Sequence, residues 1–319
     1  MARQQNGVMI ASGGDKNKKG LKGLFENIEG KVKKVDDRKW KYMDMVSNFV
    51  AMAYFFVVAV ALLVVSLVLN SPDFYGEFIL VGPNVTAKAP VEIVVNSWRI
   101  PLFQMLCIIP FVDCISHMVS AVMARVSPDI YFGRWLSKRF HPLRWFQYSL
   151  SWSFMNLTLN IILFQGNPQA LTADFIDTFV INILGLFTEY MDSVDSNTRG
   201  ENPTLKSYRG IEKFMFWLPF NLGCLLYFRI LCTRFSLLIT DAILIPKIPW
   251  EAWLTFFFLI FTEAIFVVIL ILSIKRVSFF KNYYLTSFVY TLNSIVGKSV
   301  FVFVLAGGIW GSSKAFSPN

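Results

Sequence analysis

Charged side chains are scarce in this sequence. Asp, Glu, Lys and Arg make up 16% of the 319 residues, whereas hydrophobic residues make up 55% and aromatic residues 16%, and the mean hydropathy is +0.52. Soluble globular domains typically have about a quarter of their residues charged, so the composition excludes that class. We expect an integral, multi-pass membrane protein.

Histidine and cysteine are also rare. The two histidines, His117 and His141, lack metal-ligand spacing, and no nucleophile and base form a recognisable motif, so we expect neither a metal site nor an enzyme. The cysteines have no disulfide or metal-ligand spacing and lie in apolar segments, where we interpret them as small buried hydrophobic residues: Cys107, Cys114, Cys224 and Cys232.

The basic residues lie mainly between apolar runs. The formal net charge is +9, but this placement follows the positive-inside rule, and we therefore expect no nucleic-acid partner. Residues 1–42 are interpreted as a flexible basic arm in the cytoplasm, attracted to anionic lipid. The first apolar run begins near Val46, too late and too long for a cleaved signal peptide, so the first span is expected to remain as an anchor.

The chain contains seven apolar runs long enough to cross roughly 30 Å of hydrocarbon. They lie at about Met43–Leu69, Trp98–Val126, Pro142–Gln165, Leu171–Met191, Glu212–Thr240, Trp250–Ile274 and Tyr283–Trp310. Connections rich and poor in Lys and Arg alternate, which places the N-terminus in the cytoplasm and the C-terminus outside. The fold class predicted is an all-α membrane protein, a seven-transmembrane helix bundle over residues 43–311 with a short extracellular tail at 312–319.

The first extracellular connection, about residues 71–97, is predicted to hold a β-hairpin. Two β-branched and aromatic runs, "FYGEFILVGPNV" and "APVEIVVNSW", flank a Gly-Pro-Asn turn. An exposed hairpin edge invites pairing with a second copy, so we expect a homodimer contact there. Asn84-Val85-Thr86 is an N-glycosylation sequon on the predicted outer side.

One lysine, Lys298, lies inside the last apolar run, "NSIVGKSVFVFVLAGGIWG". An ammonium at mid-bilayer costs about 2.5–3.5 kcal/mol, so a partner or a chemical use is expected. Asp113 and His117 share one face of the second span. The depth of Asp113 and of the Lys298 nitrogen is roughly 18 Å in both cases, so the two groups are expected to be level. Without Lys298, we would interpret Asp113 and His117 as an internal hydrogen-bonded pair that only fixes packing.

Three segments resemble the heliorhodopsins, microbial retinal-binding rhodopsins with inverted topology. "RWFQYSLSWSFM" is similar to that family's third-span pattern, "SIVGKS" to its retinal site, and His117 occupies the place of a family histidine. The resemblance implies all-trans retinal in the dark, held covalently as a Schiff base on Lys298, with Ser294 one turn away. It also implies a chromophore site that includes Gln147, Tyr148, Ser151, Trp152 and Met155.

The chain departs from the family at Gln147, where heliorhodopsins have a glutamate counterion. A protonated Schiff base needs an anion, because at 4 Å and an effective dielectric constant near 20 such a pair is worth about 4 kcal/mol. Either the resting pigment is deprotonated, or another carboxylate has taken the role. We hypothesise that Asp113 is that carboxylate, and that the counterion has moved from the third span to the second.

The resemblance implies a light-sensing photoreceptor. Asp113 and Glu263 are intramembrane carboxylates that also favour a light-driven proton conductance, although a purely structural role is an equal alternative. Arg229 and Arg234 are further charges in a span, without a partner that the sequence names. The competing class is a non-photoactive channel or transporter in which Lys298 and Asp113 form a buried ion pair. A sensor needs a partner that reads its state, and the sequence does not identify one.

Overall fold

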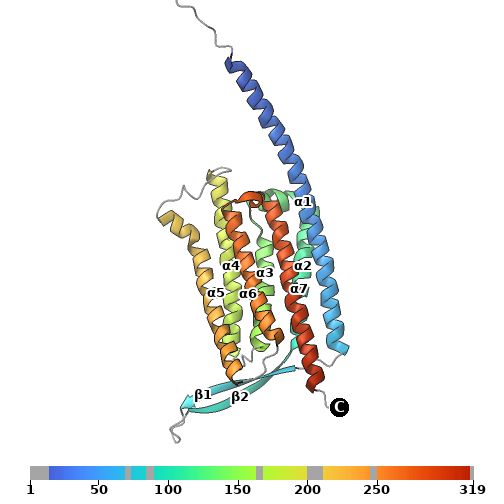
Figure 1. The fold of residues 1–319 in the computed structure, drawn as a ribbon, viewed down its shortest axis with the longest axis vertical. Helices are drawn as coiled ribbons and strands as arrows, with labels where there is room; N and C mark the ends of the chain where they lie inside the picture. Colours follow the sequence, from blue (N-terminus) through green and yellow to red (C-terminus); the bar gives the residue numbers. More distant parts are fainter. Residues whose placement is uncertain are drawn as a thin grey trace, which may run out of the picture. The chain divides into compact units, whose positions relative to one another are not determined.

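Within the part of the chain that the structure describes, seven long helices and two strands make up the fold (Figure 1). The computed structural model describes residues 14–68, 73–83, 90–162, 168–199, 211–244 and 250–316. The helices are α1 (Gly14–Val68), α2 (Leu102–Val126), α3 (Pro142–Ile162), α4 (Pro168–Arg199), α5 (Ile211–Leu244), α6 (Trp250–Ile274) and α7 (Tyr283–Phe316). The chain divides into two compact units, residues 1–43 and 44–319, and the bundle described below belongs to the second.

Helix α1 begins well before the membrane, at Gly14. The segment expected to be a flexible arm is therefore helical from this residue on, which corrects that expectation. The physical reason is local, since Lys, Glu, Leu and Arg favour helix and residues 14–42 contain no proline to interrupt it.

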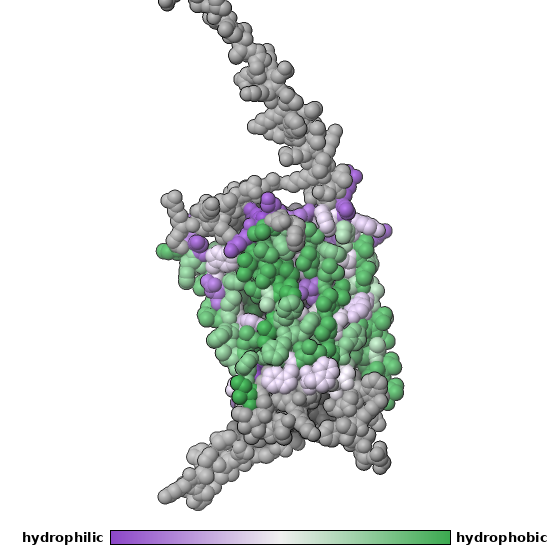
Figure 2. All heavy atoms as spheres, in the orientation of Figure 1, coloured by the Kyte–Doolittle hydropathy of each residue, from purple (hydrophilic) through white to green (hydrophobic). Residues whose placement is uncertain are grey.

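Among the described residues, six helices are long and apolar enough to cross a membrane: α1 from Arg38, α2, α4, α5, α6 and α7. Their outward side chains are hydrophobic, and Figure 2 shows the resulting band of apolar surface, bordered at one end by hydrophilic residues. The molecule is thus an integral multi-pass membrane protein, because only a lipid environment accommodates so much exposed apolar surface.

Helix α3 differs from the other six in its polarity. It lies between α2 and α4, packs against both, and buries Arg144, Gln147, Asn156 and Asn160. Several of its hydroxyls satisfy themselves locally, as when Ser149 Oγ donates to the Trp145 carbonyl at 2.8 Å. Its polar residues face other helices and not lipid, which explains why hydropathy alone does not single it out.

Strands β1 (Asp73–Pro83) and β2 (Pro90–Pro101) pair antiparallel, from Asp73 opposite Pro101 to Pro83 opposite Pro90. The register shifts by one residue between Phe78 and Ile79, as at a β-bulge. Helix α2 follows β2 directly. Residues 84–89, which include the sequon and the end of the predicted turn, lie outside the described residues.

Short helical segments close the end of the bundle where α2 joins α3 and α6 joins α7. They are η1 (Asp129–Trp135), η2 (Leu136–Lys138) and η4 (Ser278–Lys281). Arg139 follows η2 with a φ of 61°, a strained conformation for a residue with a side chain. Its guanidinium donates to Asp192 at 3.2 Å, to the Ser273 carbonyl at 2.5 Å and to the Lys281 carbonyl at 3.0 Å. These bonds tie α4, α6 and η4 together and offset the strain.

An aromatic cluster fills the bundle centre around Phe266 of α6. Its ring centroid lies 4.8 Å from that of Tyr148, 4.9 Å from Tyr290 and 5.2 Å from Trp145. A methyl group at Gly185 of α4 would overlap the Trp145 ring, so the close approach of α4 to α3 requires glycine here.

Candidate functional site

Lys298 is enclosed in the bundle, with 2% of its surface exposed. Its Nζ donates to Asp113 Oδ1 at 2.5 Å and lies 4.9 Å from the centre of the Tyr148 ring. Asp113 is fully buried on α2. The structure therefore brings together the two charges that we expected at the same depth in the membrane. The Asp113 carboxylate neutralises the buried lysine in the low-dielectric interior.

Gln147 connects this pair to His117. The Gln147 amide nitrogen donates to Asp113 Oδ1 at 2.9 Å and lies 3.2 Å from His117 Nε2. An amide nitrogen only donates, so His117 Nε2 accepts and the ring carries its proton on Nδ1. With glutamine here, the cluster of Lys298, Asp113, Gln147 and His117, hereafter the lysine cluster, holds one cation and one carboxylate.

A hydrogen-bonded chain leads from the lysine cluster to Asp44 of α1. His117 Nδ1 donates to Asn48 Oδ1 at 2.8 Å, Asn48 Nδ2 donates to the Tyr131 hydroxyl at 3.3 Å, and Tyr131 donates to Asp44 Oδ2 at 3.0 Å. Gln147 donates to both Asp113 and His117, and from His117 onward each side chain donates to the next. The chain is therefore directional from Gln147 to Asp44.

His141 joins the same chain at Tyr131. Its Nδ1 accepts the Arg144 backbone N–H at 3.3 Å, so Nε2 carries the proton and donates to the Tyr131 hydroxyl at 3.1 Å. Burial, and next the Arg144 cation, hold the pKa of His141 well below its ordinary value. Burial, and next the Asp44 carboxylate, raise the pKa of Tyr131 well above its ordinary value. Both groups are uncharged near neutral pH.

Arg144 is part of a second buried cluster nearer the end of the bundle. Arg144 Nη2 pairs with Glu189 Oε1 at 2.5 Å and donates to the Tyr283 hydroxyl at 2.7 Å. Glu189 also accepts the indole N–H of Trp145 at 2.7 Å. The ion pair is thus hydrogen-bonded on several sides, which links α3, α4 and α7 rigidly.

The other predicted site residues lie around these groups. Tyr148 donates to the Tyr290 carbonyl at 3.0 Å, and Ser151 Oγ donates to the Gln147 carbonyl at 2.9 Å. Met155 is buried in the core. Ser294 is buried one turn before Lys298, and its hydroxyl makes no hydrogen bond within the described residues. Trp152 turns away from Lys298 into a pocket.

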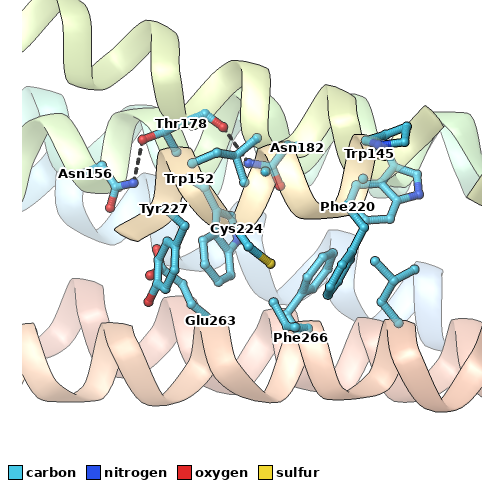
Figure 3. Close-up of a pocket in the computed structure, with 16 residues that line it drawn as sticks. Trp145, Trp152, Asn156, Thr178, Asn182, Phe220, Cys224, Tyr227, Glu263 and Phe266 are labelled. Atoms are coloured by element: carbon cyan, nitrogen blue, oxygen red, sulfur yellow. Dashed lines mark hydrogen bonds between the residues drawn. The ribbon is translucent and has the colours of Figure 1, made fainter. Parts of the chain in front are cut away.

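This pocket lies among α3, α4, α5 and α6 (Figure 3). It contains about 680 Å³ of space free of protein atoms, part of it open to the exterior. Trp152 and Phe266 form part of its wall. Phe266 makes an edge-to-face contact with Tyr148, whose ring lies below the Lys298 nitrogen. The pocket therefore adjoins the lysine cluster through two aromatic side chains.

Sequence reasoning did not find Asp44, Asn48, Tyr131 or Glu189. Asp44 and Asn48 are four residues apart at the start of the first span and so share a helix face, which is a usable signal. Tyr131 comes from a connection, and nothing in the chain order indicates that it reaches into the bundle. Of the two arginines without a named partner, Arg229 pairs with Asp174 at 2.8 Å and also with Asp177.

The fold and the site define a class: a multi-helix membrane protein with a buried lysine paired to a carboxylate beside an aromatic pocket. A family model, Heliorhodopsin, matches residues 45–310. The chain belongs to the heliorhodopsin family. No curated protein matches the sequence significantly. Family membership makes it a rhodopsin-type, light-sensing membrane protein and implies a retinal chromophore.

The described residues fit such a chromophore. The Lys298 amine has a single carboxylate partner, and Asp113 Oδ2 makes no hydrogen bond within the described residues, so the carboxylate retains accepting capacity. The neighbouring walls are aromatic and apolar, as an isoprenoid chain requires.

Proposed function

We propose that this protein is a retinal photoreceptor in which Lys298 holds retinal as a Schiff base, with the all-trans isomer in the dark. Bound retinal supplies light absorption and an isomerisation that alters its shape. The observation that carries the proposal is the buried Lys298–Asp113 pair, 2.5 Å from nitrogen to oxygen, in the last helix of a heliorhodopsin.

Asp113 acts as the counterion in this proposal. Its carboxylate forms an ion pair with the Lys298 nitrogen, and Gln147 supports it as a hydrogen-bond donor. Tyr148, Trp152, Met155 and Phe266 orient the chromophore by contact, and burial of all four excludes water. When the Lys298 nitrogen releases its proton, the N–H bond breaks and an O–H bond forms on Asp113.

The proposed topology has seven spans, with the N-terminus in the cytoplasm and the C-terminus outside. Arg134, Lys138 and Arg139 lie at the same end as Lys275, Arg276 and Lys281, since Arg139 bonds to Ser273 and Lys281. This concentration of positive charge supports a cytoplasmic location for that end. Strands β1 and β2 then lie outside, where an unpaired strand edge supports a homodimer contact.

The test is reconstitution of purified protein with all-trans retinal. A visible absorption band should form, hydroxylamine should bleach it, and Lys298→Ala should abolish it. Lys275→Ala, which changes an exposed lysine beyond α6, is the matched control and should form the normal band. Absence of a band in the wild-type protein would support the alternative, a non-photoactive channel or transporter that uses the Lys298–Asp113 ion pair.

A second candidate function is a light-driven proton conductance. The observation that favours it is the directional chain from Gln147, which also donates to Asp113, through His117, Asn48 and Tyr131 to Asp44. Oriented hydrogen bonds in a low-dielectric interior polarise one another and stabilise charge displaced along them. In this candidate a proton released to Asp113 moves toward the Asp44 end of the chain, which is cytoplasmic in the proposed topology.

A further inference from the structure

The pocket beside the lysine cluster has two chemically different ends. In Figure 3, Trp145 and Phe220 lie toward one end, and Asn156, Tyr227 and Glu263 toward the other. A site for a plain hydrocarbon needs only the first kind of lining. The polar end therefore requires an explanation of its own.

Four polar atoms on the pocket lining make no hydrogen bond within the described part of the chain. They are Trp152 Nε1, Asn156 Oδ1, the Tyr227 hydroxyl and Glu263 Oε2. Tyr227 and Glu263 also interact electrostatically with each other. Three of these side chains are at least nine-tenths buried, with exposures of 2% for Asn156, 6% for Glu263 and 9% for Trp152. Buried polar atoms are rarely left unpaired, because each costs about 1–3 kcal/mol.

Neighbouring side chains fix the orientation of the Asn156 amide. Asn156 Nδ2 donates to Thr178 Oγ1 at 2.7 Å, and Thr178 in turn donates to the Asp174 carbonyl at 2.8 Å, so the Asn156 amide is fixed with its oxygen free. Arg234 is fully buried on α5, and none of its guanidinium nitrogens has a hydrogen-bond partner among the described residues. It interacts electrostatically with Glu263. The polar end thus offers both donors and acceptors.

The polar end is also close in depth to Lys298. A methyl group at Gly297 would lie 3.1 Å from Thr262 Cγ2, so α6 and α7 touch at these residues. Glu263 follows Thr262 in α6, and Gly297 precedes Lys298 in α7. The lysine and the polar end are therefore at similar levels in the bundle.

We propose that the pocket binds an apolar ring that carries one hydroxyl group, which accepts a hydrogen bond from the Tyr227 hydroxyl and donates one to Glu263 or Asn156. This inference rests on the proposed function. It means that the protein prefers a retinal with a hydroxyl group on its ring to unsubstituted retinal. Tyr227 and Glu263 are the residues that determine the preference.

The first test uses ring analogues without an aldehyde, so that it does not depend on pigment formation. β-Ionone and 3-hydroxy-β-ionone differ by one hydroxyl, and quenching of Trp145 and Trp152 fluorescence in the protein without retinal reports their binding. The hydroxylated ring should bind about five-fold more tightly, the value of one ordinary hydrogen bond. Equal affinities would overturn the proposal.

Tyr227→Phe removes only the hydroxyl and should bring the two affinities to near equality. Tyr190→Phe, at an exposed tyrosine of α4, is the matched control and should keep the preference. Unchanged β-ionone affinity in Tyr227→Phe shows that the pocket is intact, and Glu263→Leu provides a second variant if it is not. A preference that survives both pocket variants would contradict the assignment.

The second test offers the protein equal amounts of all-trans retinal and all-trans 3-hydroxyretinal and measures the ratio of the two after extraction. The hydroxylated form should predominate about five-fold in the wild type and not in Tyr227→Phe. A protein that binds the ring analogues as expected but forms no pigment refutes the proposed function alone. A pigment that takes both retinals equally refutes this inference alone.

Discussion

The lysine cluster and the pocket differ in how completely their polar groups are paired. In the lysine cluster, Lys298, Gln147 and His117 all have hydrogen-bond partners at 2.5–3.2 Å, and Asp113 is paired through Oδ1 while its Oδ2 makes no hydrogen bond within the described residues. In the pocket, Asn156, Tyr227 and Glu263 each present an unpaired atom within the described residues. A satisfied cluster fixes its own charges and geometry, whereas an unsatisfied one acquires its geometry from what binds to it.

The largest expected effect follows from removing the Asp113 carboxylate. Asp113→Asn removes the carboxylate that pairs with the Lys298 nitrogen, so we expect the absorption band to move from the visible to the near ultraviolet at neutral pH. Absorption spectra measure the shift. Asp129→Asn, at an exposed carboxylate, is the control.

Gln147→Glu in the Asp113→Asn background should restore the visible band. The Gln147 amide nitrogen lies 2.9 Å from Asp113 Oδ1, so a carboxylate at position 147 is close enough to take over. An unshifted visible band in the single variant would refute the role of Asp113 as counterion.

Next in size is the effect of enlarging Gly185. A methyl group there overlaps Trp145, and the indole is held by its hydrogen bond to Glu189 at 2.7 Å. Gly185→Ala should lower the free energy of unfolding by about 1–3 kcal/mol, measured by thermal unfolding in detergent. Gly307→Ala is the control, because a methyl group at Gly307 would meet no neighbouring atom within 4 Å. Equal stability of the two variants would show that the pocket wall is adaptable.

The lowered pKa of His141 predicts that the free energy of unfolding depends on pH. Because its folded-state pKa is held well below the ordinary 6.5, the unfolded chain binds the extra proton first as the pH falls. The contribution of His141 to the free energy of unfolding is therefore at its full value above pH 6.5. Below that pH it decreases by about 1.4 kcal/mol per pH unit. Thermal unfolding between pH 7.5 and 5.5 measures the slope. His141→Gln should flatten it, and an unchanged slope would exclude His141 as the cause.

The smallest effect is expected at Tyr131, which accepts from Asn48 and His141 and donates to Asp44. Tyr131→Phe interrupts the chain at this point and should reduce light-driven proton currents about five-fold, the value of one lost hydrogen bond. Voltage-clamp recordings of expressing cells measure the current, with Tyr190→Phe as control. Currents equal to those of the wild type would remove the chain from the proton path.

Much of the bundle follows from the sequence because a lipid environment imposes long apolar helices on any spanning chain. Hydropathy was sufficient for α1, α2 and α4–α7. The expected pairing of Lys298 with Asp113 was possible because helix rise converts sequence position into depth. The helical start of α1 at Gly14 was missed, since charge indicated an arm but did not distinguish a helical arm from a flexible one.

By itself, the sequence determined the membrane class, the family motifs in spans two, three and seven, and the isolated lysine that needs a partner. Tertiary structure alone decided that Gln147 donates to both Asp113 and His117, that Tyr131 enters the bundle, and that four unpaired polar atoms meet in one pocket. The reason is that depth along a helix is readable from residue number, whereas the rotation of each helix about its axis depends on how its neighbours pack.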